Sequence, residues 1–224
     1  MATHTDRGSK TRAPLSRERI LRAALVLADM GGIEALTMRR LGQELQVEAM
    51  SLYNHVAGKE EILDGIVDLV FSEIALPSDR VDWKTAMRQR AISARDALLR
   101  HPWATSLMQS RSKPGLATLR HHNSVIGILR NAGFTIDMAA HAFSVMDGYI
   151  YGFALQQINL PSHTSEQSAA LAESILRPLS ADEYPHLAEM IVEHALKPGY
   201  DYAEEFEFGL DLILNGIEEL RGTA

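Results

Sequence analysis

One stretch of the chain, residues 36–59 (LTMRRLGQELQVEAMSLYNHVAGK), constrains the fold more than any other. Its periodicity predicts two short helices, at residues 37–45 and about 48–56, because apolar residues four positions apart share one helix face. The apolar pairs are Leu41 with Leu45 and Leu52 with Val56. Thr37 is a candidate N-cap of the first helix, and only residues 46–47 remain for the turn. Two short helices joined in this way form a helix-turn-helix, whose second helix lies in the major groove of DNA.

Three short segments of the same region resemble the TetR family of bacterial transcriptional regulators. They are LTMRRL at residues 36–41, SLYNHV at 51–56 and GKEEIL at 58–63. The resemblance covers residues 16–74, and the order and length of the later helices are similar to the tetracycline-repressor branch of the family. It implies an all-α protein with a three-helix DNA-binding domain and a larger helical domain for ligand binding and dimerisation. We therefore expect a bacterial repressor that acts on the chromosome, binds a palindromic operator in double-stranded DNA as a homodimer, and is released by a small molecule.

The second helix and its flanks supply most of the side chains expected to contact DNA. Ser51 and Tyr53 can reach phosphate oxygens or base edges. The resemblance implies DNA contacts at the positions of Arg39, Ser51, Tyr53, His55 and Lys59. The full predicted set is Thr37, Arg39, Arg40, Glu48, Ala49, Met50, Ser51, Tyr53, Asn54, His55 and Lys59. Because Ala49, Met50 and Asn54 depart from the tetracycline repressor, the resemblance leaves the operator sequence open.

Charge is unevenly distributed along the chain. Residues 1–59 carry nine Lys/Arg and six Asp/Glu, a net +3, whereas residues 60–224 carry thirteen and twenty-three, a net −10, which together give −7. A basic front on an acidic body favours an N-terminal part that approaches a polyanion. Residues 1–15 are polar and aperiodic, which predicts a flexible arm whose deletion weakens DNA binding and its salt dependence. An ordinary solvated tail is the alternative interpretation.

Two further features of composition concern the compartment. The chain has no cysteine, which excludes disulfides, thiolate zinc sites and cysteine nucleophiles. The longest apolar run near the N-terminus, residues 23–28, is far shorter than the ~20 residues of a membrane span, and no signal-peptide pattern precedes it. We therefore expect a cytoplasmic protein with no membrane partner.

Helix breakers divide the chain into a DNA-binding part and a larger part. Residues 16–30 and 59–74 are predicted helices that brace the helix-turn-helix and connect it to the rest, and a glycine pair at 31–32 ends the first of them. The break at residues 77–79 (Pro-Ser-Asp) marks the boundary. The predicted parts are an arm at 1–15, a DNA-binding domain at 16–76 and a ligand-binding and dimerisation domain at 77–224. The later predicted helices are residues 82–100, 102–109, 115–131, 135–159, 165–176, 181–196 and 200–221.

Two of these later helices are predicted to form a dimer interface. Residues 135–159 are apolar nearly all round, and a helix apolar on every side needs partners on every side. Residues 200–221 repeat apolar positions along one face, and Gly148 and Gly152 allow another helix to approach closely. The resemblance implies a four-helix bundle across a two-fold axis, which suits two operator half-sites. Packing within one subunit is the alternative.

The larger domain has the composition of a small-molecule pocket, with Met, aromatic and isolated polar residues. The predicted ligand-binding residues are Met87, Trp103, Met108, His122, Ile126, Phe143, Met146, Asp147, Tyr151 and Gln156. Plain core packing is the alternative for each, and Asp147 either anchors a ligand or hydrogen-bonds a neighbouring helix. In the family that the chain resembles, the tetracycline-binding members hold the drug with magnesium through a His and a Glu, and the resemblance places Met108 and Gln156 at these positions. Neither is a good ligand for a hard cation, so we expect a different, largely apolar effector.

Neither a metal centre nor an active site is predicted, and no cofactor is expected. His121 and His122 are adjacent and point about 100° apart on a helix, which prevents them from sharing a metal. The chain lacks a Gly-rich phosphate loop, a nucleophile elbow and metalloprotease spacing, so an enzyme is not expected. The alternative function is a helical small-molecule-binding protein or enzyme without operator binding. In that case changes at Asp147 or Trp103, and not at Tyr53, would abolish function.

Overall fold

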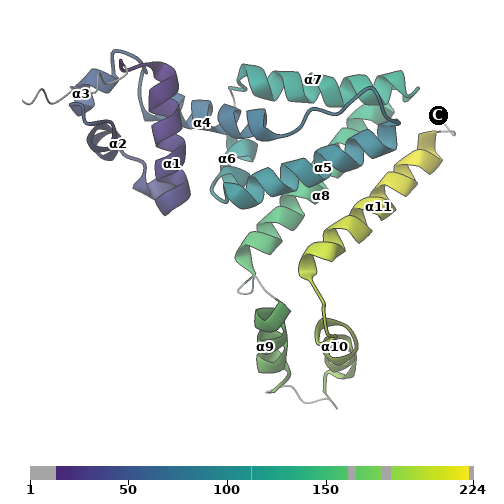
Figure 1. Cartoon of the computed structure of the whole chain (residues 1–224). Coiled ribbons are helices and arrows are strands. Elements are labelled where there is room, and N and C mark those ends of the chain that lie inside the picture. Colours follow the sequence, from purple (N-terminus) through teal and green to yellow (C-terminus); the bar gives the residue numbers. More distant parts are fainter. Residues whose placement is uncertain (1–13, 112, 161–164, 178–182, 222–224) are drawn as a thin grey trace, which may run out of the picture. The chain divides into compact units, whose positions relative to one another are not determined.

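The computed structural model describes residues 14–111, 113–160, 165–177 and 183–221, and these ranges are helical with no strand (Figure 1). The predicted all-α class is therefore confirmed. The chain divides into two compact units, Met1–Ile66 and Val67–Ala224. The predicted arm at residues 1–15 lies almost wholly outside the described residues.

The N-terminal unit contains three helices and the first half of a fourth. They are α1 (Arg17–Ala35), α2 (Met38–Leu45), α3 (Ala49–Leu52) and α4 (Lys59–Glu73). The predicted N-cap at Thr37 is confirmed, since its hydroxyl accepts from the backbone N–H of Arg40 at 3.1 Å. Ser16 caps α1 in the same way, and its hydroxyl accepts from the backbone N–H of Arg19 at 3.3 Å. Each bond satisfies one of the backbone donors that a helix start leaves without an intrahelical partner.

A kink divides α1 at its glycine pair. Gly31 and Gly32 have non-helical dihedral angles, and Gly32 has a φ of +70°, which glycine adopts at no steric cost. The regular helix therefore ends where the sequence predicts, and one further turn follows before Leu36 enters the core. The wholly buried side chains of this unit are Ile20, Ala24, Leu41, Leu52 and Ile66.

In the C-terminal unit α8 (Ile136–Asn159) is the central helix. It packs against α5 (Trp83–Arg100), α6 (Ala104–Ser110), α7 (Leu116–Asn131) and α11 (Tyr202–Arg221). The short helices α9 (Ser165–Leu176) and α10 (Pro185–Met190) lie beyond the ends of α8 and α11 (Figure 1). The π-helix η1 (Ile191–Ala195) continues α10 and packs against α9.

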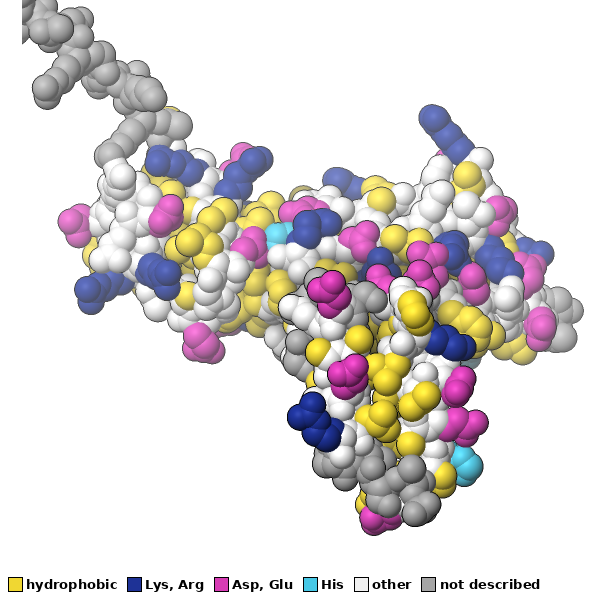
Figure 2. Space-filling view, turned by 60° about the horizontal axis from the view of Figure 1, so that its bottom comes forward, with side chains coloured by type: hydrophobic (Ala, Val, Ile, Leu, Met, Phe, Trp, Pro, Cys, Tyr) yellow, Lys and Arg dark blue, Asp and Glu magenta, His cyan; other side chains and the backbone are white. Residues whose placement is uncertain are grey.

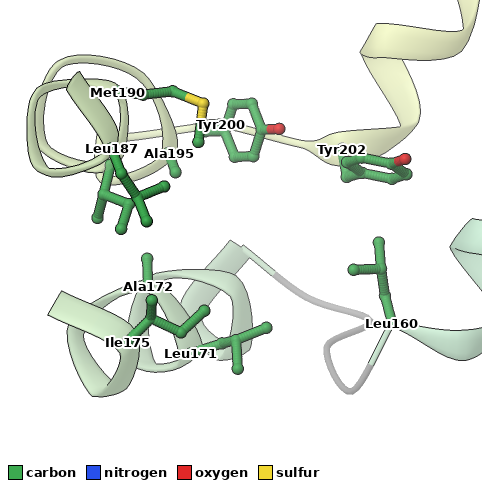
Figure 3. A pocket seen from close by; sticks show the side chains of 10 residues that line it. Leu160, Leu171, Ala172, Ile175, Leu187, Met190, Ala195, Tyr200 and Tyr202 are labelled. Carbon is green, nitrogen blue, oxygen red and sulfur yellow. The ribbon is translucent and has the colours of Figure 1, made fainter. Parts of the chain in front are cut away.

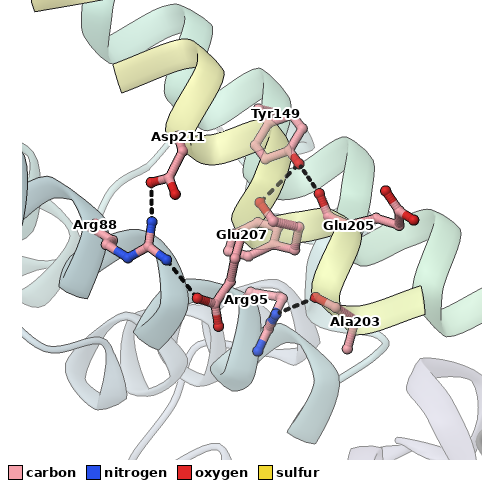
Figure 4. A network of polar contacts seen from close by, with 8 residues as sticks. Arg88, Arg95, Tyr149, Ala203, Glu205, Glu207 and Asp211 are labelled. Carbon is pink, nitrogen blue, oxygen red and sulfur yellow. Dashed lines mark hydrogen bonds and ion pairs between the residues drawn. The ribbon is translucent and has the colours of Figure 1, made fainter. Parts of the chain in front are cut away.

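Polar contacts fasten α11 to α5 and α8 (Figure 4). From α5, Arg88 pairs with Glu207 at 2.6 Å, and the Arg95 guanidinium carbon lies 4.7 Å from the ring centroid of Phe206. From α8, the Tyr149 hydroxyl lies 3.0 Å from the backbone carbonyl oxygen of Phe206, to which it donates. These contacts hold α5, α8 and α11 together.

The two units divide earlier than the predicted boundary at residues 76–77. The division falls between Ile66 and Val67, inside α4. The second half of this helix packs within the C-terminal unit, since Asp68 accepts hydrogen bonds from the start of α7 and the Phe71 ring lies 5.6 Å from that of His121. The Pro-Ser-Asp break ends the helical region. The packing of the last turns of α4 decides that these turns belong to the C-terminal unit.

Two predicted helices differ in the structure. The helix expected at residues 48–56 is only Ala49–Leu52, because the backbone N–H of Tyr53 bonds to the Met50 carbonyl three residues back and tightens the chain into a turn. The helix expected at 181–196 begins at Pro185, within the described residues, and widens into η1. There the Leu196 N–H reaches the Ile191 carbonyl five residues back, at 2.9 Å.

Candidate DNA-binding surface and effector site

The turn between α2 and α3 shows the close packing of a helix-turn-helix. Gln46 ends α2 with a φ of 57°, and the Val47 N–H bonds to the Gly42 carbonyl at 2.9 Å. A Cβ at Gly42 would lie 2.9 Å from the Val47 carbonyl oxygen, so a side chain there would force the turn away from α2. Leu52 is wholly buried. The turn predicted at residues 46–47 is confirmed, and the buried side of α3 leaves its opposite side facing solvent.

Most predicted DNA-binding side chains lie on the surface of this unit. The exposed ones are Thr37, Arg39, Arg40, Glu48, Met50, Tyr53, Asn54 and His55, and the partly exposed ones are Ala49, Ser51 and Lys59. Met50 is 75% exposed, which leaves it available for an apolar contact such as a thymine methyl. Tyr53 and His55 lie in the turn after α3 and not within the helix, and the His55 N–H bonds to the Leu52 carbonyl at 2.9 Å.

A carboxylate fixes the start of α4, where Lys59 is the first residue. Glu61 accepts the backbone N–H of Ala57 at 2.8 Å and pairs with Arg17 Nε at 2.8 Å. These two hydrogen bonds, with the Ala57 bond contributing most, lower the pKa of Glu61 against the opposing effect of partial burial. Glu61 therefore connects the turn that precedes Lys59 to α4 and to the start of α1.

A buried polar cluster joins α5, α7 and α8 in the C-terminal unit. Arg90 is 1% exposed, and its Nη2 donates to Oδ1 of Asp147 at 2.5 Å. Its Nε donates to Nε2 of the wholly buried His121 at 3.3 Å. Arg90 Nη1 and His121 Nδ1 are buried and have no hydrogen-bond partner in the structure. Of the two alternatives for Asp147, the hydrogen bond with a neighbouring helix is present, and Arg90 of α5 is its donor.

Burial keeps the titratable groups around this ion pair neutral. Burial first, and then the Arg90 charge, lower the pKa of His121 to about 3. Burial also lowers the pKa of His122, although the Asp147 charge opposes it. The pKa of Tyr151 is raised by burial and by the Asp147 charge, so its hydroxyl stays protonated. Because His121 Nε2 accepts from Arg90, its neutral ring carries the proton on Nδ1.

Aromatic rings border the same cluster. The Phe71 ring centroid lies 5.6 Å from those of both His121 and His122. The His122 ring centroid in turn lies 5.2 Å from that of Phe143, with the ring planes at 80°. His122, Phe143 and Tyr151 are only partly buried, whereas Arg90 Nη1 and His121 Nδ1 are fully buried.

The predicted ligand-binding residues lie in several environments. Those in or beside the polar cluster are His122, Phe143, Asp147 and Tyr151. The wholly buried ones are Met87 and Met146, which belong to the core. The others are Trp103, which is buried, Met108 and Ile126, which are partly buried, and Gln156, which is exposed. The Gln156 side-chain oxygen accepts from the Tyr202 hydroxyl at 2.8 Å.

Sequence reasoning missed Arg90 and His121 as members of this site. Arg90 lies three residues after Met87 and four before Ala94, and both of these are buried on the inner face of α5. A charged residue inside an otherwise apolar helix face was therefore the available signal. Its partner was also recognisable, because the acid in the apolar helix α8 needed a buried cation.

A separate cavity of about 200 Å³ lies between α9 and the α10–η1 segment (Figure 3). Its lining is Leu160, Leu171, Ala172, Ile175, Leu187, Met190, Ile191, Ala195, Tyr200 and Tyr202. None of the predicted ligand-binding residues lines it. The same part of the unit carries apolar side chains on its surface (Figure 2), among which Met190 and Val192 are exposed. The cavity is smaller than the 300–1,000 Å³ typical of ligand pockets, and its walls are almost entirely apolar.

No three His, Asp or Glu side chains of the described residues come together in a group that could hold a metal ion. None of the described helices is long and apolar enough to cross a membrane.

The fold and the two sites together define a class of protein. A helix-turn-helix with an exposed polar face, followed by a larger helical unit with a buried polar cluster, is the architecture of a DNA-binding transcriptional regulator. Residues 20–66 match the profile described as "Bacterial regulatory proteins, tetR family", and residues 76–221 match "Tetracyclin repressor-like, C-terminal domain". The chain belongs to the TetR family of transcriptional regulators.

Relatives of established role support this assignment. The chain is 32% identical to the HTH-type transcriptional repressor DrrR1 of Streptomyces coeruleorubidus, over 92% of this chain and 78% of that protein. It is 29% identical to the class C tetracycline repressor protein of Escherichia coli, over 93% of each chain. Among solved structures, that of ActR from Streptomyces coelicolor in complex with actinorhodin has a TM-score of 0.78 and 28% identity, covering 94% of this chain and 100% of that one.

Proposed function

We propose that this protein is a homodimeric repressor that binds a palindromic operator. It is released from the DNA when a small, largely apolar molecule binds its C-terminal unit. The observation that carries the proposal is the helix-turn-helix with its exposed Arg39, Tyr53 and His55. Met50 on the same short helix is 75% exposed and can meet a thymine methyl group. Its action is binding and not catalysis.

Exposed apolar surface on α8 and α11 supports the dimer. Val145 and Leu155 on α8 are about half exposed, as is Leu212 on α11. A Cβ at Gly148 or Gly152 would meet no atom within 4 Å, so this side of α8 is open to a second helix. Exposed apolar residues in such a line mark an interaction surface. A second copy supplies matching helices and also the second DNA-binding unit that a palindrome requires.

The polar cluster supports an effector site in the C-terminal unit. Its two buried donors without partners, Arg90 Nη1 and His121 Nδ1, are what a bound ligand would satisfy. α4 carries residues of both units, and Phe71 on its second half contacts the two cluster histidines. A ligand that moves α7 would therefore bias the position of α4. A coupling of about 1–3 kcal/mol between the ligand and DNA sites would change operator affinity by roughly 5- to 150-fold.

The effector is expected to bind without magnesium. Met108 and Gln156 offer a thioether and an amide where tetracycline-binding relatives place cation ligands, and Gln156 already bonds to Tyr202. ActR, the solved relative in complex with actinorhodin, supports a small molecule as the effector.

Electrophoretic mobility shifts with the DNA upstream of the protein's own gene test the proposal. Wild-type protein is expected to bind this DNA with a steep salt dependence. Tyr53→Ala is expected to weaken binding, and Tyr184→Ala, which alters an equally exposed tyrosine of the C-terminal unit, serves as the control. Sedimentation of Leu212→Glu tests the dimer, since a charge on an apolar interface should yield monomers. Binding that is insensitive to sequence, or unchanged in Tyr53→Ala, would refute the repressor.

A further inference from the structure

We infer that the effector of this protein is a neutral, flat aromatic molecule whose carbonyl or quinone oxygen accepts hydrogen bonds from Arg90 Nη1 and His121 Nδ1. The inference rests on the proposed function, because it assumes that the effector binds at the polar cluster. It adds the charge and hydrogen-bonding class of the ligand, which neither the fold nor the family determines.

The net charge of the polar cluster limits the charge of its ligand. Arg90 is the cation of the cluster, and Asp147 already neutralises it at 2.5 Å. His121 and His122 are held neutral, and Tyr151 remains a neutral phenol that also hydrogen-bonds to Asp147. The cluster therefore carries no net charge. An ionised carboxylate entering it would lose its hydration and stand beside a second carboxylate, without a cation of its own.

The donors without partners limit the hydrogen-bonding groups of the ligand. Both atoms without partners are donors, because a guanidinium has no acceptor and the neutral His121 ring carries its proton on Nδ1. A ligand oxygen with only lone pairs satisfies such donors, and a quinone or ketone oxygen is a neutral group of this kind. A ligand amine or ammonium would face these N–H groups without an acceptor. Ligands whose polar atoms are mainly donors are disfavoured, because the two N–H groups need acceptors.

The aromatic rings beside the polar cluster limit the shape of the ligand. The rings of Phe71, His121, His122 and Phe143 follow one another with centroid separations of 5.6, 5.9 and 5.2 Å. Of these rings, His122 and Phe143 are partly exposed, whereas the His121 side chain is wholly buried. Rings beside a site favour a flat aromatic ligand, since such a ligand can make stacked and edge-to-face contacts with them.

The test compares two probes that differ in one group. Chrysazin is a neutral anthraquinone with two hydroxyl groups, and rhein is the same molecule with an added carboxylate. Calorimetric titration of the full-length protein is expected to show chrysazin binding roughly tenfold more tightly than rhein. Asp147→Asn leaves Arg90 without its counter-charge and is expected to reverse the order of the two affinities. Equal affinities in wild type, tighter binding of rhein, or binding of neither probe would overturn the inference.

A second variant keeps the test decisive even where Asp147→Asn fails to fold. His121→Phe retains the ring but removes the Nδ1 donor, and is expected to weaken chrysazin roughly tenfold, the loss of one buried hydrogen bond. His186→Phe, at a histidine side chain that is 96% exposed, is the matched control with unchanged affinity. Mobility shifts distinguish failure of this inference from failure of the proposed function. Wild-type protein that does not bind the operator would refute the proposed function. Wild-type protein that binds the operator but prefers rhein to chrysazin would refute this inference alone.

Discussion

Asp68 on α4 connects that helix to the start of α7, and its removal is expected to destabilise the C-terminal unit by a defined amount. Asp68 Oδ1 accepts the backbone N–H of Thr118 at 2.8 Å and the Thr118 hydroxyl at 2.9 Å, while Oδ2 accepts the N–H of Ala117 at 3.2 Å. The carboxylate thus caps α7 from another helix. A Cβ at Gly115, the N-cap position of α7, would overlap this carboxylate.

The magnitude follows from these contacts. A helix cap contributes about 0.5–2 kcal/mol, and a carboxylate at a helix N-terminus about 0.3–1 kcal/mol more, so Asp68→Ala should lower the free energy of unfolding by about 2 kcal/mol. Gly115→Ala should cost a similar amount, because the added methyl group pushes the carboxylate away and the same bonds are lost. The double variant should also cost about 2 kcal/mol, and not the roughly 4 kcal/mol of independent changes.

Urea unfolding followed by circular dichroism, at one fixed protein concentration, measures these differences. Gly127→Ala is the control, since a Cβ there meets no atom within 4 Å and the residue lies inside α7. It should stabilise the protein by about 0.5–1 kcal/mol through helix propensity. Additive costs for Asp68→Ala and Gly115→Ala would refute the reasoning, because they would mean that the two residues act through different contacts.

Three further predictions concern other contacts. Arg90→Met leaves Asp147 buried without its cation and should cost about 3–5 kcal/mol in urea unfolding, whereas Arg90→Met/Asp147→Leu should recover most of the loss; an unrecovered double variant would contradict this. The pKa of Glu61 is lowered in the folded state, so its contribution to stability is complete above its ordinary pKa of 4.5 and is lost as the pH falls through the lowered value. Thermal unfolding of Glu61→Gln should accordingly depend less on acidification than wild type, and identical pH profiles would disprove the role. Tyr149→Phe loses a hydroxyl that donates to α11 and should cost about 1 kcal/mol, with Tyr53→Phe as an exposed control that leaves the unfolding midpoint unchanged.

Much of the N-terminal unit could be predicted because its signals are local. The caps at Ser16 and Thr37, the glycine pair and the turn at Gln46 all depend on residues within four positions of one another. The length of α3 could not be predicted, because the apolar residue at position 56 continues the helical spacing although the chain has already turned. The Tyr53 N–H bond to the Met50 carbonyl decides where the helix ends, and spacing alone does not record it.

The polar cluster was only partly predictable because its members come from separate helices. Asp147 was recognisable as an acid in an apolar helix, but its partner Arg90 stands 57 residues earlier in the chain. The cavity between α9 and η1 was not predicted at all, since it depends on a π-helix that no spacing rule indicates.

By itself the sequence determined the all-helical class, the helix-turn-helix and the family, because helix periodicity, caps and a two-residue turn are local and leave few alternatives. Only the tertiary structure decided where the two units divide, which histidine carries an unpartnered proton and which charge compensates Arg90. These outcomes depend on which helix faces meet, and on the free energy of burying polar groups between them, which acts between residues far apart in the chain.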